Sequence, residues 1–310
     1  MRLRIFALAL VVTLAGPAGA SAKPILGFND APQTFIEHAA AVEAAGATLA
    51  RVPVNWAMTE SLSPSLLRWD ELDQTVSELR AHQVTPMFAI FSAPKSAAGG
   101  CEPEPDPPAT CGVAPGHTDA YVQFAVALLE RYPGSLVQTW NEPDLEMFGG
   151  MSPGRVAELT NALVAVAPGL VVGAAEAPVD THALRYTKRA YRLTDPSVPM
   201  ALHLYPRSPI NANGYRGVWR RAQELARKRP LWVTEVGYAS SSYGARGQAS
   251  ALASTYRFLA REGAAAIIVH RLRDSEIQAS PWLSSLGLLR EDGSPKPAFE
   301  ALRAAAAAGR

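Results

Sequence analysis

Short apolar segments alternate strictly with longer amphipathic segments along most of the 310-residue chain. The apolar segments have the length and composition of β-strands, and they cover residues 24–29, 48–54, 84–91, 136–141, 170–175, 199–205, 230–235 and 264–270. The amphipathic segments have helical periodicity, and they cover residues 33–45, 70–82, 118–132, 153–166, 181–193, 214–228, 247–261 and 297–308. Strands that alternate with helices in this way predict βαβ units and therefore a parallel sheet.

The number of these units favours a closed barrel. Eight strand–helix units in roughly 250 residues match the size of a (β/α)8 barrel, or TIM barrel. The alternative is an open doubly wound sheet, which usually has a glycine-rich phosphate-binding turn after its first strand. The chain has Asp30-Ala31-Pro32 at that place, and no glycine- or serine-rich linker divides it. We therefore expect a single α/β domain, a (β/α)8 barrel formed by residues 23–310.

The first 22 residues have the pattern of a secretory signal peptide. Arg2 and Arg4 form a basic start, residues 5–14 are apolar, and residues 20–22 (Ala-Ser-Ala) provide a small-residue cleavage site. A membrane anchor is the alternative, but the apolar run is far shorter than the ~20 residues that span a bilayer. We expect a secreted protein, extracellular or periplasmic, with no membrane contact after cleavage of residues 1–22.

The charge balance limits the possible partners. Lys and Arg total 29 while Asp and Glu total 28, which gives a formal net charge of +1. This balance is unlike that of a strongly basic protein that binds nucleic acid or a membrane surface. The cationic run within residues 216–229 is typical of a solvated helix face. We expect no nucleic-acid partner, and we expect a monomer.

The two cysteines, Cys101 and Cys111, flank a proline-rich segment. In an exported protein, the oxidising compartment favours a disulfide between them. Closing such a short loop stabilises a fold by ~3 kcal/mol if the effect is mainly one of chain entropy. A pair of metal ligands is the alternative, but no cluster of histidines or cysteines lies nearby in the sequence.

Two glutamates end predicted strands, at the side of a (β/α)8 barrel where active sites lie. Glu142 ends the fourth strand within WNEPD (residues 140–144), and Glu235 ends the seventh within WVTEVGY (residues 232–238). Hydrolysis of a glycosidic bond requires two carboxyl groups in one pocket, because one donates a proton while the other attacks or activates water. The alternative is that each glutamate caps its strand or pairs with an arginine.

These motifs resemble the catalytic motifs of clan A glycoside hydrolases, which are retaining enzymes with a (β/α)8 fold. WNEPD is similar to the acid/base motif of the fourth strand, and WVTEVGY is similar to the nucleophile motif of the seventh. Residues 286–302 (LGLLREDGSPKPAFEAL) resemble the end of such barrels. Family 5, which is cellulase-like, and family 39 are the nearest groups, and the sequence does not choose between them.

The resemblance implies a catalytic role for both glutamates. Glu142 would be the general acid and later the base, Glu235 the nucleophile that forms a glycosyl-enzyme, and Asn141 would bind the sugar 2-hydroxyl. We expect a secreted hydrolase that cleaves a β-linked oligo- or polysaccharide with retention of configuration, without a metal or organic cofactor. The alternatives are a transglycosylase on the same scaffold and a carbohydrate-binding or cell-wall-associated module without catalysis.

Three further strand residues have roles that the resemblance implies. His203 and Tyr205 lie two apart and so on one face of the sixth strand. His203 would line the pocket and tune the acid/base, and Tyr205 would bond Glu235. Arg51, on the second strand, would keep the pKa of Glu235 low through its opposite charge.

Further candidates for substrate binding are Asn29, at the end of the first strand, and the aromatic residues Trp56 and Trp282. For both tryptophans, ordinary packing is the equally weighted alternative. The alternation with its neighbours predicts that Trp232 faces the helices.

Two places differ from the resembled families. Strand 8 ends in Val269-His270-Arg271, where many clan members have a tryptophan under the cleaved sugar, and the end of strand 3 lacks the histidine of family 5. Both differences argue against a typical cellulase. We expect the long loop after strand 3, which carries the cysteines, to wall one end of the cleft and to influence specificity.

Overall fold

The computed structural model describes residues 23–60, 67–101, 104–105, 108–176, 183–205, 214–275 and 280–308. The expected signal peptide at residues 1–22 lies outside the described residues, and so do the first two residues of the helix expected at 181–193. Every helix within the described ranges is too short or too polar to cross a bilayer.

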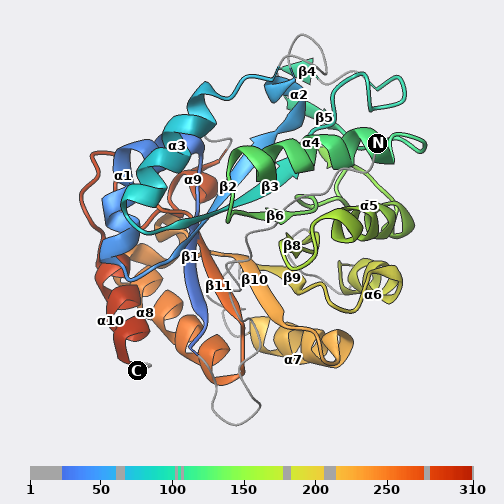
Figure 1. The fold of residues 1–310 in the computed structure, drawn as a ribbon. Coiled ribbons are helices and arrows are strands. Elements are labelled where there is room, and N and C mark those ends of the chain that lie inside the picture. The colour runs from blue at the N-terminus through green and yellow to red at the C-terminus, as the bar shows by residue number, and fades with distance from the viewer. Residues whose placement is uncertain are drawn as a thin grey trace.

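Eight parallel strands form one continuous sheet that curves round on itself (Figure 1). In chain order they are β1 (Ile25–Asn29), β2 (Leu49–Asn55), β3 (Thr85–Phe91), β6 (Leu136–Gln138), β8 (Val171–Val172), β9 (Met200–Leu204), β10 (Leu231–Val236) and β11 (Ala266–His270). Their spatial order is β8-β6-β3-β2-β1-β11-β10-β9, so strands that follow each other in the chain are paired in the sheet, except β8 and β9, which are its two ends. This arrangement confirms the predicted single (β/α)8 barrel.

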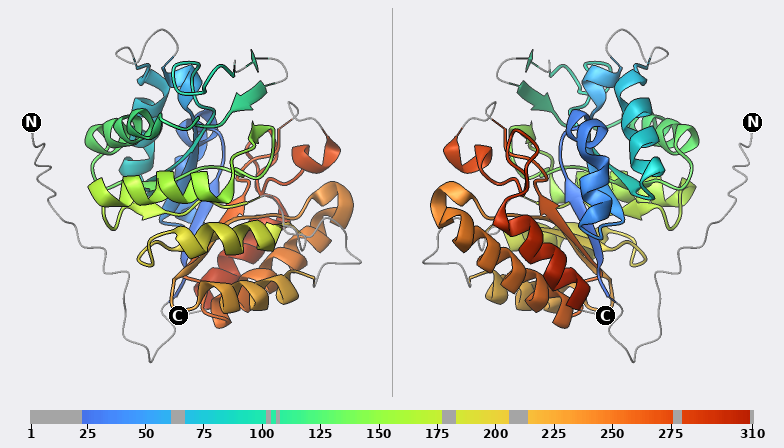
Figure 2. Two further views of the ribbon diagram at one scale, coloured as in Figure 1. Left: turned by 90° about the vertical axis from the view of Figure 1, so that its right-hand side faces the viewer. Right: turned by 90° about the vertical axis from the view of Figure 1, so that its left-hand side faces the viewer.

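The predicted helices cover the outside of this sheet (Figure 1, Figure 2). They are α1 (Pro32–Ala44), α3 (Asp70–Ala81), α4 (Thr118–Arg131), α5 (Pro153–Val166), α6 (Ala183–Leu193), α7 (Tyr215–Ala226), α8 (Ser240–Arg261) and α10 (Pro297–Ala308). Helix α8 begins earlier than the sequence predicts, because the chain continues as helix through a kink at Gly244, where φ is 65°. Two short helices, α2 (Trp56–Thr59) and α9 (Pro281–Ser284), lie in loops and were not predicted.

Local sequence signals explain where several helices begin. The side chain of Ser152 accepts a hydrogen bond from the Arg155 N–H, and Pro153 occupies the first turn, so α5 has a regular N-terminal cap. Helix α3 has Asp70, Glu71 and Asp73 in its first turn, where negative charge complements the helix dipole.

The barrel core has an inner part that the strands enclose. The residues of this inner cluster are Leu49, Met87, Val172, Ala175, Ala201, Trp232, Ala266 and Ile268. These residues come from strands around the whole barrel and pack against one another, so they fill its inside. The predicted outward direction of Trp232 is therefore wrong: the pairing of β10 with β9 shifts register between Val233 and Glu235, so Trp232 and Glu235 both face inward.

The seam between β8 and β9 closes the barrel without a regular strand pair. The Gly173 N–H donates to the Pro199 carbonyl (3.2 Å). The hydroxyl of Tyr191, on α6, lies between the two strands, where it donates to the Ala174 carbonyl (3.0 Å) and accepts from the Ala201 N–H (2.9 Å). A Cβ on Gly173 would lie 2.2 Å from this hydroxyl, so only glycine leaves room for the bridging tyrosine.

A second, small sheet links two loops at one end of the barrel (Figure 1). Its strands are β4 (Glu104–Pro105), β5 (Pro108–Cys111) and β7 (Phe148–Gly149). The pairs Thr110–Phe148 and Cys111–Gly149 join the loop after β3 to the loop after β6, which the sequence did not predict. The predicted disulfide between Cys101 and Cys111 is present and closes the first of these loops.

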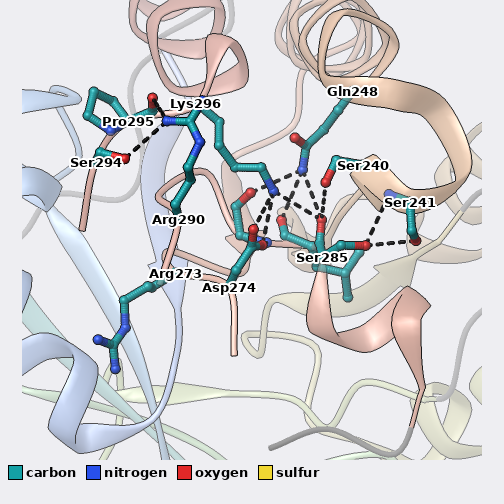
Figure 3. A network of polar contacts seen from close by, with 12 residues as sticks. Ser240, Ser241, Gln248, Arg273, Asp274, Ser285, Arg290, Ser294, Pro295 and Lys296 are labelled. Carbon is teal, nitrogen blue, oxygen red and sulfur yellow. Dashed lines mark hydrogen bonds and ion pairs between the residues drawn. The ribbon is translucent and has the colours of Figure 1, made fainter. Parts of the chain in front are cut away.

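A polar network fixes the long segment between β11 and α10 (Figure 3). Lys296 Nζ donates to both carboxylate oxygens of Asp274 (3.0 and 2.8 Å) and to the Ser285 carbonyl (3.3 Å). Gln248 Nε2, from α8, donates to the Gly287 carbonyl (3.1 Å) of the same segment. Burial lowers the pKa of Lys296, and the contact with Asp274 opposes this shift. The network anchors the segment that carries α9 and its Trp282.

The bridging role of Tyr191 leads to a stability prediction. Replacing Tyr191 with Phe leaves the buried Ala174 carbonyl and Ala201 N–H without the hydroxyl between them. We expect the free energy of unfolding to fall by about 1–3 kcal/mol, as measured by urea denaturation. Tyr256→Phe is the matched control, because the buried Tyr256 hydroxyl has no hydrogen-bond partner among the described residues. Equal losses in the two variants would contradict a bridging role.

Candidate active site

Glu142 lies just beyond β6, at the carboxyl ends of the strands. Its N–H donates to the Ala175 carbonyl (2.8 Å), and Asn141 forms a parallel bridge with Ala175, so this segment stays attached to the neighbouring strand. The φ angle of Glu142 is 40°, a left-handed conformation that few residues other than glycine adopt. Strain of this kind is concentrated at functional sites. The backbone turn brings the carboxyl group to the side chain of His203, on β9.

Glu235 lies on β10, directly opposite His203 in the strand register. Glu235 is 8% exposed, and its carboxylate has three neighbours that donate hydrogen bonds. Arg51 Nη1 donates to Oε1 (2.6 Å), and the Tyr205 hydroxyl donates to Oε2. Asn29 Nδ2 makes a longer contact with Oε1 (3.5 Å). The carboxylate is thus held by groups from β1, from β2 and from the residue directly after β9.

His203 lies between the two glutamates and is completely buried. Its Nδ1 is 2.8 Å from Glu142 Oε1, and its Nε2 is 3.6 Å from Glu235 Oε1. One oxygen of Glu142, one ring nitrogen of His203 and one oxygen of Glu235 all lie within 4.8 Å of one another. The structure therefore brings the two predicted glutamates together, with the predicted histidine beside both.

Arg51 is the centre of the polar network below Glu235. Its guanidinium is 1% exposed and donates four hydrogen bonds. Besides Glu235, the acceptors are Asn29 Oδ1 (3.0 Å), Asn141 Oδ1 (2.7 Å) and Gln138 Oε1 (2.6 Å). A guanidinium has no acceptor atom, so each of these contacts fixes which atom of the partner faces it. The arginine therefore orients one amide on β1 and two amides on β6 and the segment that directly follows it.

The surroundings of Glu235 favour its ionised form. Burial alone would raise the pKa of this carboxyl group, but its electrostatic interactions with His203, Arg51 and His270 and the bond from Tyr205 lower it to about 2. The same environment, burial first and the Glu235 charge second, raises the pKa of Tyr205 well above its ordinary value. At neutral pH, the site therefore contains a carboxylate anion beside a phenol that keeps its proton.

The structure places the predicted aromatic residues in different environments. Trp282, on α9, is partly exposed and stands edge-on to Tyr205, with ring centroids 5.5 Å apart. Trp56 is 1% exposed, because its indole stacks on Phe124 of α4 at 5.2 Å, and its Nε1 donates to Glu60 (2.7 Å). The expectation that Trp56 binds substrate is therefore corrected, since neither face of the ring is open to a sugar.

The cluster of Glu142, His203 and Glu235 has the donor atoms of a metal site, so its charges need consideration. Arg51 lies 2.6 Å from the Glu235 oxygen that would bind a cation. A fixed guanidinium at this distance repels a metal ion and already neutralises the carboxylate. The arrangement suits proton transfer between side chains better than cation binding.

Two residues of the site were missed by the sequence analysis. Gln138 bonds Arg51 and also donates to the Gly173 carbonyl (3.2 Å) and to the Thr234 hydroxyl (3.3 Å), all inside the barrel. The sequence does contain a pattern that could have identified Gln138. This residue precedes Glu142 by an even number of positions, so strand alternation would place both side chains on the same face. His270 was noted as a difference from the resembled families, but its contact with Asn29 was not predicted.

Comparisons with known proteins agree on the fold. No family model and no curated protein matches the sequence. Among solved structures, a family 39 glycoside hydrolase from the gut symbiont Bacteroides cellulosilyticus WH2 has a TM-score of 0.70 at 18% identity, over 92% of this chain and 64% of that one. GH5_18 from Streptomyces cattleya, in complex with GlcNAc, has a TM-score of 0.71 at 19% identity, over 94% of this chain and 81% of that one.

An exo-β-1,4-mannosidase from Opitutaceae bacterium strain TAV5 gives a similar result, with a TM-score of 0.68 at 18% identity. The alignment covers 94% of this chain and 60% of the mannosidase, so the chain spans less than two thirds of two of these three proteins. The chain has the fold of clan A glycoside hydrolases. The resemblance inferred from the two glutamate motifs is thus confirmed at the level of the fold.

The buried pair of Arg51 and Glu235 leads to a prediction on stability. Arg51→Met leaves the Glu235 carboxylate buried without its guanidinium, and we expect a loss of about 3–5 kcal/mol in the free energy of unfolding at pH 7. Adding Glu235→Gln to this variant restores part of the loss, because it removes the uncompensated charge. Arg131→Met, which breaks an exposed ion pair with Asp73, is the control and costs about 1 kcal/mol or less.

The same pair gives the pH dependence a definite sign. The folded-state pKa of Glu235, about 2, is below the ordinary value of 4.5, so its stabilising contribution is complete above about pH 4.5 and is lost as the pH falls toward 2. The stability of Glu235→Gln should therefore fall less steeply than that of the wild type over this interval. The free energy of unfolding of both proteins is measured by urea denaturation at each pH. An equal dependence on pH in the wild type and in Glu235→Gln would contradict the assignment.

Proposed function

We propose that this chain is a secreted retaining glycoside hydrolase, with Glu142 as general acid/base and Glu235 as nucleophile. The observation that carries the proposal is a pair of buried carboxyl groups with opposed oxygens and unequal surroundings. Their oxygens lie within 4.8 Å, which agrees with the carboxyl separation of about 5–5.5 Å in retaining enzymes rather than about 6.5–9.5 Å in inverting ones. Arg51 and Tyr205 surround Glu235, whereas His203 bonds Glu142.

The chemistry follows from these surroundings. An oxygen of ionised Glu235 attacks the anomeric carbon, the bond from that carbon to the leaving oxygen breaks, and Glu142 gives its proton to the leaving oxygen. In the second step Glu142 takes a proton from water, whose oxygen displaces Glu235 and releases the sugar. Arg51 and Tyr205 stabilise Glu235 both as the attacking anion and as the departing one. Asn141, oriented by Arg51, is placed to bind the sugar 2-hydroxyl.

The proposed substrate is a β-linked oligo- or polysaccharide with uncharged sugar units. The named activity of the mannosidase neighbour, and the GlcNAc bound by the GH5_18 neighbour, support a substrate of this class. The strand pairing of β5 with β7 supports the loop after β3 as a wall of the cleft, because it joins that loop to the chain just beyond Glu142. The signal pattern of residues 1–22 and the disulfide support secretion.

Substitution of the two glutamates tests the proposal directly. On aryl β-glycosides, Glu235→Ala should reduce kcat/KM by at least about 1,000-fold, because no glycosyl-enzyme forms. Glu142→Gln should lose about 100–10,000-fold on substrates with a poor leaving group, and less on 2,4-dinitrophenyl glycosides, whose leaving group needs little protonation. NMR of the first-formed product should show the substrate's anomeric configuration.

Glu78→Gln, an exposed change on α3, is the matched control and should keep wild-type rates. Wild-type rates in both active-site variants would rule out the assignment. Binding of glycans without release of reducing ends in any assay would favour a carbohydrate-binding module, and transfer of the sugar to an added alcohol in place of water would indicate a transglycosylase.

The disulfide loop is expected to affect both stability and specificity. Replacing Cys101 and Cys111 with Ser opens the loop, and we expect a loss of ~3 kcal/mol in the free energy of unfolding. Because the loop is paired with the chain beyond Glu142, we also expect the ratio of kcat/KM values for long and short glycans to change. An unchanged substrate profile would show that the loop is not a wall of the cleft.

A further inference from the structure

His270 ends β11 and lies in register with Asn29 of β1, which in turn lies in register with Arg51 of β2. The three residues therefore form a continuous row across three neighbouring strands, with His270 and Asn29 at the carboxyl ends of β11 and β1 and Arg51 within β2. The residue as a whole is partly exposed, and its imidazole stands perpendicular to the ring of Tyr205, with an interplanar angle of 87° and centroids 5.9 Å apart. Tyr205 bonds Glu235, so His270 lies at the edge of the catalytic pair without contacting either glutamate by a hydrogen bond.

The contacts of Asn29 fix the protonation of His270. Arg51 can only donate, so the oxygen of the Asn29 amide must face it, as the contact of 3.0 Å from Nη1 to Oδ1 shows. The amide nitrogen is then the atom that faces His270, and it lies 2.6 Å from Nδ1. A primary amide nitrogen donates and does not accept, so Nδ1 must be the bare, accepting nitrogen of the ring. The proton of neutral His270 is therefore on Nε2.

Protonation of His270 on both nitrogens would be opposed by the same contacts. A proton on Nδ1 would face the N–H groups of Asn29, and a flipped amide would turn those groups toward Arg51. Desolvation of the ring lowers the pKa of His270, and this effect outweighs the negative charges of Glu235 and Asp30, which raise it. The Asn29 contact thus holds His270 as a neutral ring with a single N–H donor.

This donor has no partner among the residues that the structure describes. Among the described residues, the hydrogen bonds of the His270 side chain involve Nδ1 and none involves Nε2. The nearby cations are both already paired, Arg51 with Glu235 and Arg271 with Asp30. A neutral donor beside compensated charges suits an uncharged hydroxyl oxygen better than a carboxylate.

We propose that His270 Nε2–H donates a hydrogen bond to a hydroxyl of the sugar bound over Glu235, so that His270 selects sugars with a hydroxyl at that position. The proposal rests on the proposed function, since it assigns the sugar-binding contact of the same site. It extends that function from the two reacting carboxyl groups to a residue that chooses the substrate. Arg51 binds Glu235 and orients the Asn29 amide, and this amide in turn orients the His270 ring that contacts the sugar.

The tautomer can be tested without any substrate. In protein labelled with 15N-histidine, long-range 1H–15N spectra should show His270 neutral, with Nε2 protonated and Nδ1 bare, from pH 5 to 8. Asn29→Leu should remove the preference and shift the 15N signals of His270, while those of the half-buried His82, which contacts Glu43, stay unchanged. A proton on Nδ1, or an imidazolium in this pH range, would overturn the proposal whether or not the protein is an enzyme.

The sugar contact is tested with 4-nitrophenyl β-glucoside, β-mannoside and β-xyloside and with monodeoxy analogues of the best substrate. In the wild type, loss of one particular hydroxyl should reduce kcat/KM about 10-fold or more. In His270→Phe, the same deletion should change kcat/KM less than about 3-fold. His82→Phe, a change at a half-buried residue that directly follows α3, should behave like the wild type. An equal effect of His270→Phe on every analogue would show that the ring only packs.

A binding measurement separates this proposal from the proposed function. Glu142→Gln protein labelled with 15N-histidine is titrated with methyl β-glucoside and methyl β-mannoside. A shift of the His270 Nε2 signal with at least one of them supports the sugar contact even if no aryl glycoside is hydrolysed, in which case only the catalytic assignment fails. If neither methyl glycoside shifts this signal, or if a β-glucuronide is preferred by the wild type and not by His270→Phe, the hydroxyl contact is wrong.

Discussion

The guanidinium of Arg51 is the interaction on which the rest of the site depends. It is a full positive charge enclosed by the barrel, which would be strongly unfavourable without compensation. Glu235 supplies the opposite charge, and the amides of Asn29, Gln138 and Asn141 accept the remaining bonds. Since the arginine can only donate, the same contacts decide the orientation of every side chain around it. Charge compensation and the arrangement of the site are therefore one feature of this fold.

Strand register explains why these residues meet. Parallel strands in a barrel bring their carboxyl ends to a common level, so polar residues that end different strands become neighbours. Asn29 is paired with Arg51 on one side and with His270 on the other, and Glu235 is paired with His203. Contacts between residues far apart in the chain thus follow from strand pairing, with little need for special loop structure. The loops instead determine what lies above this level.

This distinction also explains what the sequence could predict. The periodicity of the chain predicts the eight barrel strands, and the position of Glu142 and Glu235 at strand ends predicts that they share one side of the barrel. The direction of Trp232 was not predictable from alternation, because the register shift in β10 reverses it locally. The burial of Trp56 depends on stacking with Phe124, which lies on α4, and no local pattern encodes that contact. The pairing of β5 with β7 is likewise a contact between two loops.

The seam between β8 and β9 has a further consequence for the two glutamates. In the spatial order of the strands, Glu142 follows β6, next to one edge of the sheet, and Glu235 lies on β10, next to the other edge. The short path between them crosses the seam, where a tyrosine hydroxyl stands in place of a regular ladder of backbone bonds. The two carboxyl groups therefore meet across the one place in the described barrel where neighbouring strands have no regular ladder of backbone hydrogen bonds. A side chain on the outer layer, Tyr191, thus bridges the joint across which the two glutamates meet.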